Sequence, residues 1–262
     1  MKQIALTGNK LISALRPQDR LVLAEMVDEV HLTAGTVIYH PGDEVRYAYF
    51  PRFSAIASFH VVMSDGSAVE TAITGCEGAV CGIVSKGSLP AYARCCIMHG
   101  GDFYRISCAN LNEAAERSPY LRNLFARYAD CLVSQIFQSV ACNATHTIEQ
   151  RAAKWLAAAV DRTGSKSVTM TQDQLGSILG VGRTYVSRVI RRMKEAGTVE
   201  TRRGAIVVKQ RDHLDRISCD CNQLVEQHFE TVLRGVYPHA NGQDGWTASM
   251  NGNGQDARYQ IS

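Results

Sequence analysis

The sequence predicts an α+β protein with an antiparallel β-roll or jelly-roll in its first half, one long helix in the middle and a small helical domain with a β-hairpin at the end. Three observations support this prediction. Short β-rich segments separated by turn signals fill residues 30–108, an apolar stripe with helical spacing follows Ser118, and two helices joined by glycines are indicated at residues 171–195.

The composition and the cysteine content are those of an ordinary globular protein with reduced thiols. Hydrophobic residues make up 45% and charged residues 20% of the 262 positions, which excludes collagen-like, disordered and coiled-coil classes. No apolar run approaches the roughly 18 residues of a membrane helix, and the first ten residues lack the apolar segment of a secretory signal. Nine cysteines are an odd number and cannot all pair, and the chain is too long for a fold held together by disulfides, so reduced thiols are expected. We therefore expect a cytoplasmic protein without membrane contact.

The charge is distributed unevenly along the chain. Residues 147–216 hold 14 Lys and Arg against 7 Asp and Glu, a net charge of +7, whereas the remaining residues have a net charge of −4. A basic segment inside a mildly acidic chain indicates a polyanionic partner for that segment alone.

Turn signals divide the first half of the chain into short elements. Two helices are expected at residues 9–15 and 17–30. The strands that follow are expected at residues 36–39, 47–50, 54–62 and 69–73. Asp65-Gly66, between the last two strands, is a type I′ hairpin signal. Strands at this spacing are typical of an antiparallel sandwich or barrel.

A long helix is expected after Ser118, which can cap it ahead of Pro119 at the first helical position. Apolar residues recur every three or four positions as far as Val140, which gives a helix of about 22 residues and about 33 Å. One small barrel cannot cover such a helix, so the stripe predicts pairing with the same helix of a second subunit. A long core helix within one domain is the alternative. The residues assigned to the dimer contact are Leu121, Leu124, Phe125, Tyr128, Leu132 and Ile136.

Residues 171–199 have the pattern of a helix-turn-helix. Thr171 to Gln174 is a capping box that opens a short helix, Gly180-Val181-Gly182 permits a sharp turn, and a second helix is expected from Arg183 to Glu195. A similar capping box, Thr147 to Gln150, opens a helix ahead of this pair.

The second helix of the pair would present a basic, hydroxyl-bearing face to solvent. An Arg guanidinium can donate two hydrogen bonds to guanine, and the first residues of a recognition helix reach the base edges. We assign Arg183, Thr184 and Arg188 to base readout, with Tyr185 as a further candidate, and Ser187 and Arg191 to phosphate contacts. The alternative is that these charges only solvate an amphipathic helix. The capping box and the glycine turn favour DNA binding.

A basic hairpin is expected after this helix, with Arg202-Arg203-Gly204 at its tip. A hairpin beside a helix-turn-helix is the wing of a winged helix. Arg202 and Arg203 would lie near backbone phosphates and add affinity without much sequence information.

Together these features resemble the Crp/Fnr transcription regulators. The stretch TQDQLGSILGVGRTYVSRVIRRMKEAGTVETRRGAIVV is similar to their C-terminal pattern, and GCEGAVCGIV, ACNATHTIEQRAAKWL and Cys219-Asp220-Cys221 are similar to one bacterial subgroup. The resemblance covers residues 8–225. It implies a homodimer with paired long helices that binds double-stranded DNA and recruits or obstructs RNA polymerase at promoters. We divide the chain into a cyclic-nucleotide-binding-like β-roll sensor domain at 8–117, a dimerisation helix and hinge at 118–143, a winged helix-turn-helix domain at 144–236 and a flexible tail at 237–262.

Residues 75–94 correspond to the loop that holds ribose and phosphate in the cyclic-nucleotide-binding members of this family. The candidate ligand contacts are Glu77, Gly78, Gly82 and Arg94. Glu77 precedes Gly78 instead of following a glycine, and Arg94 is followed by Cys95 instead of a hydroxyl residue. A cyclic nucleotide is therefore disfavoured, and a structural ion pair of Arg94 is the alternative.

The cysteines do not identify a metal or cluster site. The oxygen-sensing family members hold an iron–sulfur cluster through cysteines near the N-terminus, whereas the first cysteine here is Cys76. Cys219 and Cys221, with His213 nearby, can bind soft metals, but a structural site needs four ligands and no fourth can be named. Buried free thiols are the simpler interpretation, so no metal and no cofactor is predicted. Residues 142–146 are a candidate hinge, where His146 either hydrogen-bonds across the hinge or caps a helix end.

The sequence thus predicts a transcription regulator and not an enzyme, since it lacks the Gly-x-Ser-x-Gly, Walker, His-Glu-x-x-His and dinucleotide-binding motifs. We expect a dimer that reads a palindromic promoter site with the helix from Arg183 to Glu195. One alternative is a regulator whose DNA binding depends on a small ligand or on thiol redox state sensed by the N-terminal domain. Another is a sensor domain that acts through protein contacts.

Overall fold

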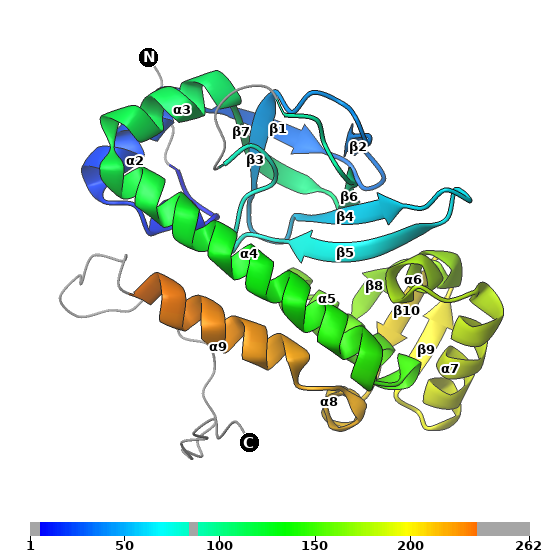
Figure 1. Cartoon of the computed structure of the whole chain (residues 1–262). Coiled ribbons are helices and arrows are strands. Elements are labelled where there is room, and N and C mark those ends of the chain that lie inside the picture. The colour runs from blue at the N-terminus through cyan, green and yellow to red at the C-terminus, as the bar shows by residue number, and fades with distance from the viewer. Residues whose placement is uncertain (1–5, 84–88, 235–262) are drawn as a thin grey trace, which may run out of the picture.

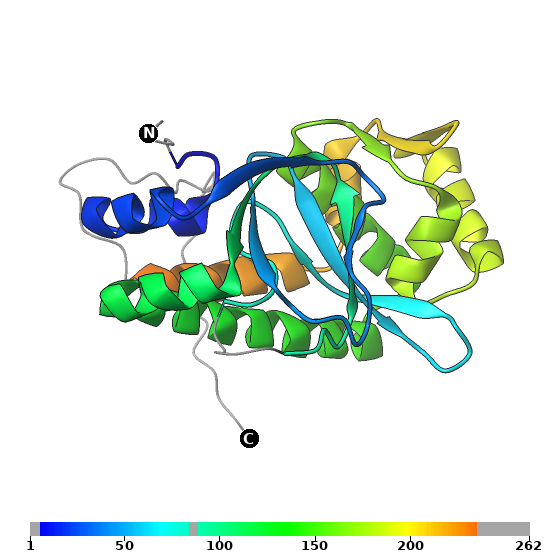
Figure 2. The same cartoon turned by 90° about the horizontal axis from the view of Figure 1, so that it is seen from above.

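The computed structural model describes residues 6–83 and 89–234 and confirms the α+β architecture. Two antiparallel sheets form the first half of the chain, the long helix α4 (Pro119–Thr145) crosses beside them, and a small helical domain with a hairpin follows (Figure 1, Figure 2). Within the described ranges, no helix is long and apolar enough to cross a membrane. Residues 237–262, predicted to be a flexible tail, lie outside the described residues.

The two N-terminal sheets enclose an apolar core. Their strands are β1 (Asp28–Leu32), β2 (Val37–Tyr39), β3 (Tyr47–Pro51), β4 (Ile56–Val62), β5 (Ala68–Thr74), β6 (Arg94–His99) and β7 (Gly101–Ser107). One sheet has the order β1-β7-β3 and the other β2-β6-β4-β5, and every pairing is antiparallel. Tyr39, Ala57 and Ile97 of the second sheet pack with Phe103 of the first. Strand residues that face this core therefore alternate with residues that face outward.

Three local predictions differ from the structure. The helix expected at residues 17–30 ends early as α2 (Pro17–Ala24), because β1 pairs its backbone with β7. The hairpin around Asp65-Gly66 forms, but Val62 pairs with Ala68, which leaves residues 63–67 as the loop in place of a two-residue turn. The Asp65 carboxylate accepts a hydrogen bond from the Ser67 N–H at 2.9 Å inside this loop. The first predicted helix is also shorter, as α1 (Lys10–Ser13).

Helix α4 is longer than its apolar stripe predicted. The Ser118 hydroxyl accepts a hydrogen bond from the Leu121 N–H at 3.0 Å, which confirms the predicted cap. The helix has 27 residues, or about 40 Å, and ends only at Thr145. Its first half packs into a core shared with α1, α2, β3 and α3 (Cys108–Arg117), where the rings of Phe50 and Phe125 lie 6.0 Å apart.

The last described helix, α9 (Cys221–Arg234), lies antiparallel against α4 (Figure 1). The Phe229 ring meets Tyr128 edge-on at 6.1 Å between centroids, and Arg127 Nη1 donates to the Val232 carbonyl at 2.6 Å. Phe229 and Leu233 belong to the same apolar core as the first half of α4. The packing therefore places α9 with the N-terminal half, whereas the sequence-based division placed residues up to 236 in the winged helix-turn-helix domain.

The C-terminal domain has the predicted winged helix-turn-helix form. Its elements are α5 (Ile148–Thr163), β8 (Ser167–Thr169), α6 (Gln172–Leu179), α7 (Arg183–Glu195), β9 (Val199–Arg202), β10 (Ala205–Val208) and α8 (Arg211–Ile217). Both predicted capping boxes are present, at Thr147 and Thr171. Gly180 ends α6 in the left-handed region at a φ of 68°, where a side chain would strain the backbone. Strand β8 was not predicted, and it pairs with the outer edge of the wing strand β10.

We predict that Phe229→Ala destabilises the protein, because it removes a buried ring that joins α9 to α4. Phe229 is 6% exposed, and truncation of a buried phenylalanine costs about 3–5 kcal/mol. Leu224→Ala on the same helix is the control, since Leu224 is 40% exposed and surface changes stay within about 0.5 kcal/mol. Urea unfolding of both variants measures the difference. Equal midpoints would contradict the docking of α9 on α4.

Candidate nucleic-acid interface

Helix α7 has an apolar face in the domain core and a basic face in solvent. Val186, Val189, Ile190 and Met193 are at most 3% exposed and fix the helix against α6 and β9. The opposite face carries the exposed side chains of Arg183, Thr184, Tyr185, Arg188 and Arg191. The helix lies at the edge of the molecule in Figure 1. A nucleic acid can therefore approach this face.

The charges on this face are held by weak, exposed contacts. Arg183 Nη1 lies 3.4 Å from Asp173 Oδ2, and the Arg188 guanidinium stands over the Tyr185 ring at 5.1 Å. Exposed ion pairs contribute about 0–1 kcal/mol, so phosphates and bases can replace these partners. Ser187 is placed differently: it is half-buried, and its hydroxyl donates to Gln172 Oε1 at 2.6 Å. This hydrogen bond ties α7 to the first turn of α6.

The wing places two further arginines beside this helix. Arg202 ends β9, Arg203 follows it in the turn to β10, and both side chains are exposed. Arg202 Nε lies 3.4 Å from Glu200 Oε1, and this hydrogen bond lowers the pKa of the Glu200 carboxyl. The wing thus carries an acidic neighbour that an approaching phosphate must displace.

Of the four candidate ligand contacts of the N-terminal domain, only Gly82 lines a cavity found among the described residues near this loop. Glu77 accepts a hydrogen bond from the Gly75 N–H at 2.9 Å and lies 3.5 Å from Arg162 of α5. Gly78 packs so closely against Tyr128 that a Cβ would lie 1.8 Å from the phenol oxygen. Glu77 thus forms a structural ion pair with Arg162. Arg94 opens β6 and is half-buried.

A small cavity of about 260 Å³ lies in the roll near Gly82. Its lining includes Val45, Phe59, Cys81, Leu89, Tyr92 and Cys108. Within the residues that the structure describes, this lining contains no charged side chain, and neither Glu77 nor Arg94 belongs to it. A cyclic nucleotide needs a cation for its phosphate, so the described lining fits that ligand poorly.

The predicted dimer residues need a correction. Leu121, Leu124, Phe125 and Tyr128 are at most 1% exposed and are covered by the chain's own core, so they cannot touch a second subunit. Leu132 is half-buried against the same core, and Ile136 alone of the set is exposed. The solvent-facing apolar stripe lies further along α4. It consists of Val133, Ile136, Phe137 and Val140.

A cavity of about 110 Å³ lies between the N-terminal sheet and the C-terminal domain, with residues of both in its wall. Glu70 of β5 lies in its wall, and Glu70 Oε1 accepts a hydrogen bond from Trp155 Nε1 of α5 at 3.2 Å. The other carboxyl oxygen is buried without a hydrogen-bond partner in the described part of the chain. Desolvation raises the pKa of Glu70 to about 8, although Trp155, Arg162 and Lys154 each act to lower it. This carboxyl is thus held neutral at the boundary between the two domains.

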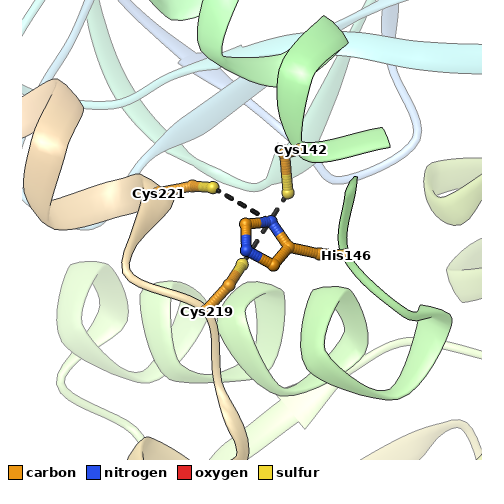
Figure 3. A group of neighbouring side chains, drawn as sticks. All are labelled: Cys142, His146, Cys219 and Cys221. Carbon is orange, nitrogen blue, oxygen red and sulfur yellow. Dashed lines mark hydrogen bonds between the residues drawn. The ribbon is translucent and has the colours of Figure 1, made fainter. Parts of the chain in front are cut away.

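The structure also gathers metal-binding side chains that the sequence did not connect. Cys142, His146, Cys219 and Cys221 bring one ligand atom each to within 4.8 Å of one another (Figure 3). His213, the histidine noted from the sequence, instead hydrogen-bonds the Thr198 hydroxyl. His146 meets both sequence alternatives, because its backbone caps the end of α4 and its ring Nδ1 lies 3.5 Å from Cys221 Sγ across the hinge. The sequence pointed only to the pair Cys219 and Cys221, because their partners Cys142 and His146 lie about 75 residues earlier in the chain.

Comparison with known protein families identifies the C-terminal domain. Residues 150–217 match the family described as the Crp-like helix-turn-helix domain. A comparison with curated proteins gives no match.

Several solved structures share the fold of this chain. FixK2 from Bradyrhizobium japonicum is similar in structure, with a TM-score of 0.61, 17% identity, and coverage of 74% of this chain and 98% of that chain. A crp/fnr-family regulator from Eubacterium rectale has a TM-score of 0.60, 15% identity, and coverage of 79% and 96%. The c-di-GMP responsive regulator CLP of Xanthomonas campestris has a TM-score of 0.62, 13% identity, and coverage of 74% and 100%. At these identities the solved structures show a common fold.

The fold and the basic helix define a DNA-binding transcription regulator of the winged helix-turn-helix class. Residues 150–217 belong to the family of Crp-like helix-turn-helix domains, and the whole chain shares the fold of the solved Crp/Fnr-type regulators. The matched domain is that of a transcription regulator, in agreement with the expectation that the chain is not an enzyme.

We predict that stability falls as pH rises from about 4.5 to 8, because folded Glu70 keeps a proton that the unfolded chain, with a carboxyl pKa of 4.5, has released. Each pKa unit corresponds to about 1.4 kcal/mol, so the loss amounts to a few kcal/mol. Glu70→Gln removes this part of the pH dependence. Urea unfolding at pH 5 and pH 8 measures it, with Glu195→Gln at the exposed end of α7 as the control. The same pH slope in wild type and Glu70→Gln would contradict a buried neutral carboxyl.

Proposed function

We propose that the protein is a homodimer that reads a palindromic promoter site with α7 of each subunit. The observation that carries this proposal is the exposed arginine face of α7 on a Crp-like helix-turn-helix. In this motif the second helix enters the major groove, and its N-terminal residues contact the base edges. RNA polymerase is the partner that such a promoter-bound regulator recruits or obstructs.

The exposed residues of α7 divide into base-reading and phosphate-binding groups. Arg183, Thr184 and Arg188 lie on the first half of the exposed face, and Tyr185 stacks on Arg188. Arg183 and Arg188 can each pair with guanine O6 and N7 through two hydrogen bonds. Arg191 lies one turn further on, where phosphate contact is favoured, and Ser187 supports α7 through Gln172. Arg202 and Arg203 extend the phosphate contacts to the wing.

The dimer contact is the exposed stripe of α4. Val133, Ile136, Phe137 and Val140 are 45–69% exposed and follow the i, i+3, i+4, i+7 spacing of one helix face. Two such stripes can pair as in a coiled-coil seam and exclude water from the phenylalanine rings. Pairing of α4 places two copies of α7 on one face of the dimer, and it predicts half-sites about 34–36 Å apart.

A second candidate, a regulator gated by an effector, is favoured by direct contact between the two domains. Strand β5 packs on α6, where Val69 faces Gly180, and Glu70 hydrogen-bonds Trp155. A ligand or a thiol change that shifts β5 would therefore move the domain that carries α7. Dependence of DNA affinity on an added effector separates this candidate from a regulator that is active without one.

We predict that Arg183→Ala lowers affinity for the selected DNA site by about 1–3 kcal/mol and relaxes base choice at one position, because it removes a base contact. Arg202→Ala is expected to weaken binding to all DNA alike and to reduce the slope of log affinity against log salt by about 1. Selection from random duplexes followed by binding titrations at several salt concentrations measures both effects. Arg117→Ala, an exposed arginine of α3, is the control. Unchanged affinity in both test variants would refute the assigned interface.

We predict that Phe137→Glu converts the dimer to a monomer and abolishes preference for a palindrome over a half-site, because it places a charge in the apolar stripe. Phe137 is 69% exposed, so the monomer fold is expected to survive. Sedimentation velocity and titration of palindromic and half-site duplexes measure the two effects. Tyr92→Glu, at an exposed aromatic residue just before β6, is expected to remain dimeric. A dimer that persists in Phe137→Glu would place the subunit contact elsewhere.

A further inference from the structure

We propose that Cys142, His146, Cys219 and Cys221 bind one zinc ion that joins the end of α4 to the start of α9. Three cysteines and one histidine are a common ligand set of structural zinc sites. The four residues come from two segments: Cys142 and His146 from the last turn and cap of α4, Cys219 from the connection between α8 and α9, and Cys221 from the first position of α9 (Figure 3). The three cysteines form a buried cluster of their own, apart from the larger apolar cores.

Two of the distances between the ligand atoms match those of a tetrahedral site around a single ion. Zinc bonds of about 2.3 Å to sulfur and 2.0–2.1 Å to nitrogen at tetrahedral angles place two sulfurs about 3.8 Å apart and a sulfur and a nitrogen about 3.6 Å apart. In the structure, Cys142 Sγ lies 3.7 Å from Cys219 Sγ, and Cys221 Sγ lies 3.5 Å from His146 Nδ1. The remaining pairs of ligand atoms lie within 4.8 Å of one another, so small side-chain movements would bring all four onto one ion.

Two neighbouring side chains donate hydrogen bonds to the sulfurs. Gln138 Nε2 lies 3.2 Å from Cys221 Sγ, and Lys154 Nζ lies 3.3 Å from Cys142 Sγ. Donors of this kind favour thiolates, and they orient metal ligands in protein sites. Three thiolates around Zn²⁺ have a net charge of −1, which the Lys154 ammonium offsets. On binding, the three thiol protons are released to solvent.

The geometry favours zinc over two other outcomes of the same residues. An iron–sulfur cluster spreads its ligands over two or more irons, which requires larger separations than these. A disulfide between Cys142 and Cys219 needs the sulfurs to approach to about 2.05 Å, and it would leave Cys221 and His146 without a function. A single tetrahedral ion uses all four residues with only small side-chain movements.

The ion would act at the hinge between the N-terminal half and the DNA-binding domain. It fixes the start of α9 to the end of α4, three residues or fewer from the first turn of α5. The site thus resists both the detachment of α9 and the rotation of α5 relative to α4. Because its ligands lie outside the contact surface of α7, loss of zinc and loss of the arginine interface are separable by experiment.

The test begins with elemental analysis of the full-length protein purified without chelators. We expect about one zinc per chain in wild type and in Cys76→Ser, a matched control outside the cluster. Cys219→Ser and His146→Ala are expected to lose the metal. Replacement of zinc by Co²⁺ is expected to give the intense visible bands of a tetrahedral site and the near-ultraviolet bands of thiolate ligands. These signals report the ligand set independently of DNA binding.

Two milder variants guard against a failure to fold. His146→Cys keeps four ligands, so it is expected to retain zinc and to shift the cobalt spectrum toward that of a four-sulfur site. Gln138→Leu keeps all ligands but removes a hydrogen bond to sulfur, and it is expected to lower zinc affinity about 10- to 100-fold in competition with a chelator. Wild-type protein without zinc, zinc content unaffected by Cys219→Ser, visible absorption of an iron–sulfur cluster, or a Cys142–Cys219 disulfide found by mass spectrometry would each overturn the proposal.

Discussion

Burial of the aromatic face of α4 fixes the positions of the other parts of the molecule. Phe125 packs near Phe50 of the roll, and Tyr128 lies between Gly78 and Phe229 of α9. A side chain at position 78 would displace the Tyr128 ring, so one contact joins the sheet, the long helix and the last helix. The remaining length of α4 runs beside β5, with an apolar stripe in solvent and the hinge at its end. The proposed dimer contact and the proposed zinc site both lie on this part of the helix.

The C-terminal domain has its own apolar core, and polar contacts help to attach it to the roll. Its own interior is apolar and continuous from α5 to β10, whereas its contacts with the roll include the Glu70–Trp155 hydrogen bond and the Glu77–Arg162 pair. Polar contacts between domains contribute less than apolar burial and depend on protonation and salt. Apolar contacts accompany these polar ones, since Val69 faces Gly180 and Met98 packs against the C-terminal core. Such a boundary suits a regulator, because a modest change in free energy can shift it.

Local chemistry made the recognition helix predictable, whereas the cysteine cluster was not. Arg183 and Arg188 were assigned from a capping box, a glycine turn and the helical period, all of which act within a few residues of one another. Ser187 was expected to face DNA but donates to Gln172, since α6 and α7 approach closely at their first turns. Cys142 and Cys219 are 77 positions apart, and only the return of the chain along α4 brings their sulfurs together.

The amino-acid sequence by itself determined where most helices begin and end, because caps, glycines and helical periodicity act between neighbours. It determined the winged helix-turn-helix, the Ser118 cap and the basic character of α7. The tertiary structure decided which face of α4 is buried, since the apolar stripe is wider than one partner surface and the first half is covered by the chain itself. It also decided the place of α9 and the meeting of Cys142, His146, Cys219 and Cys221. Contacts of this kind depend on packing across the whole chain, which no short stretch of residues encodes.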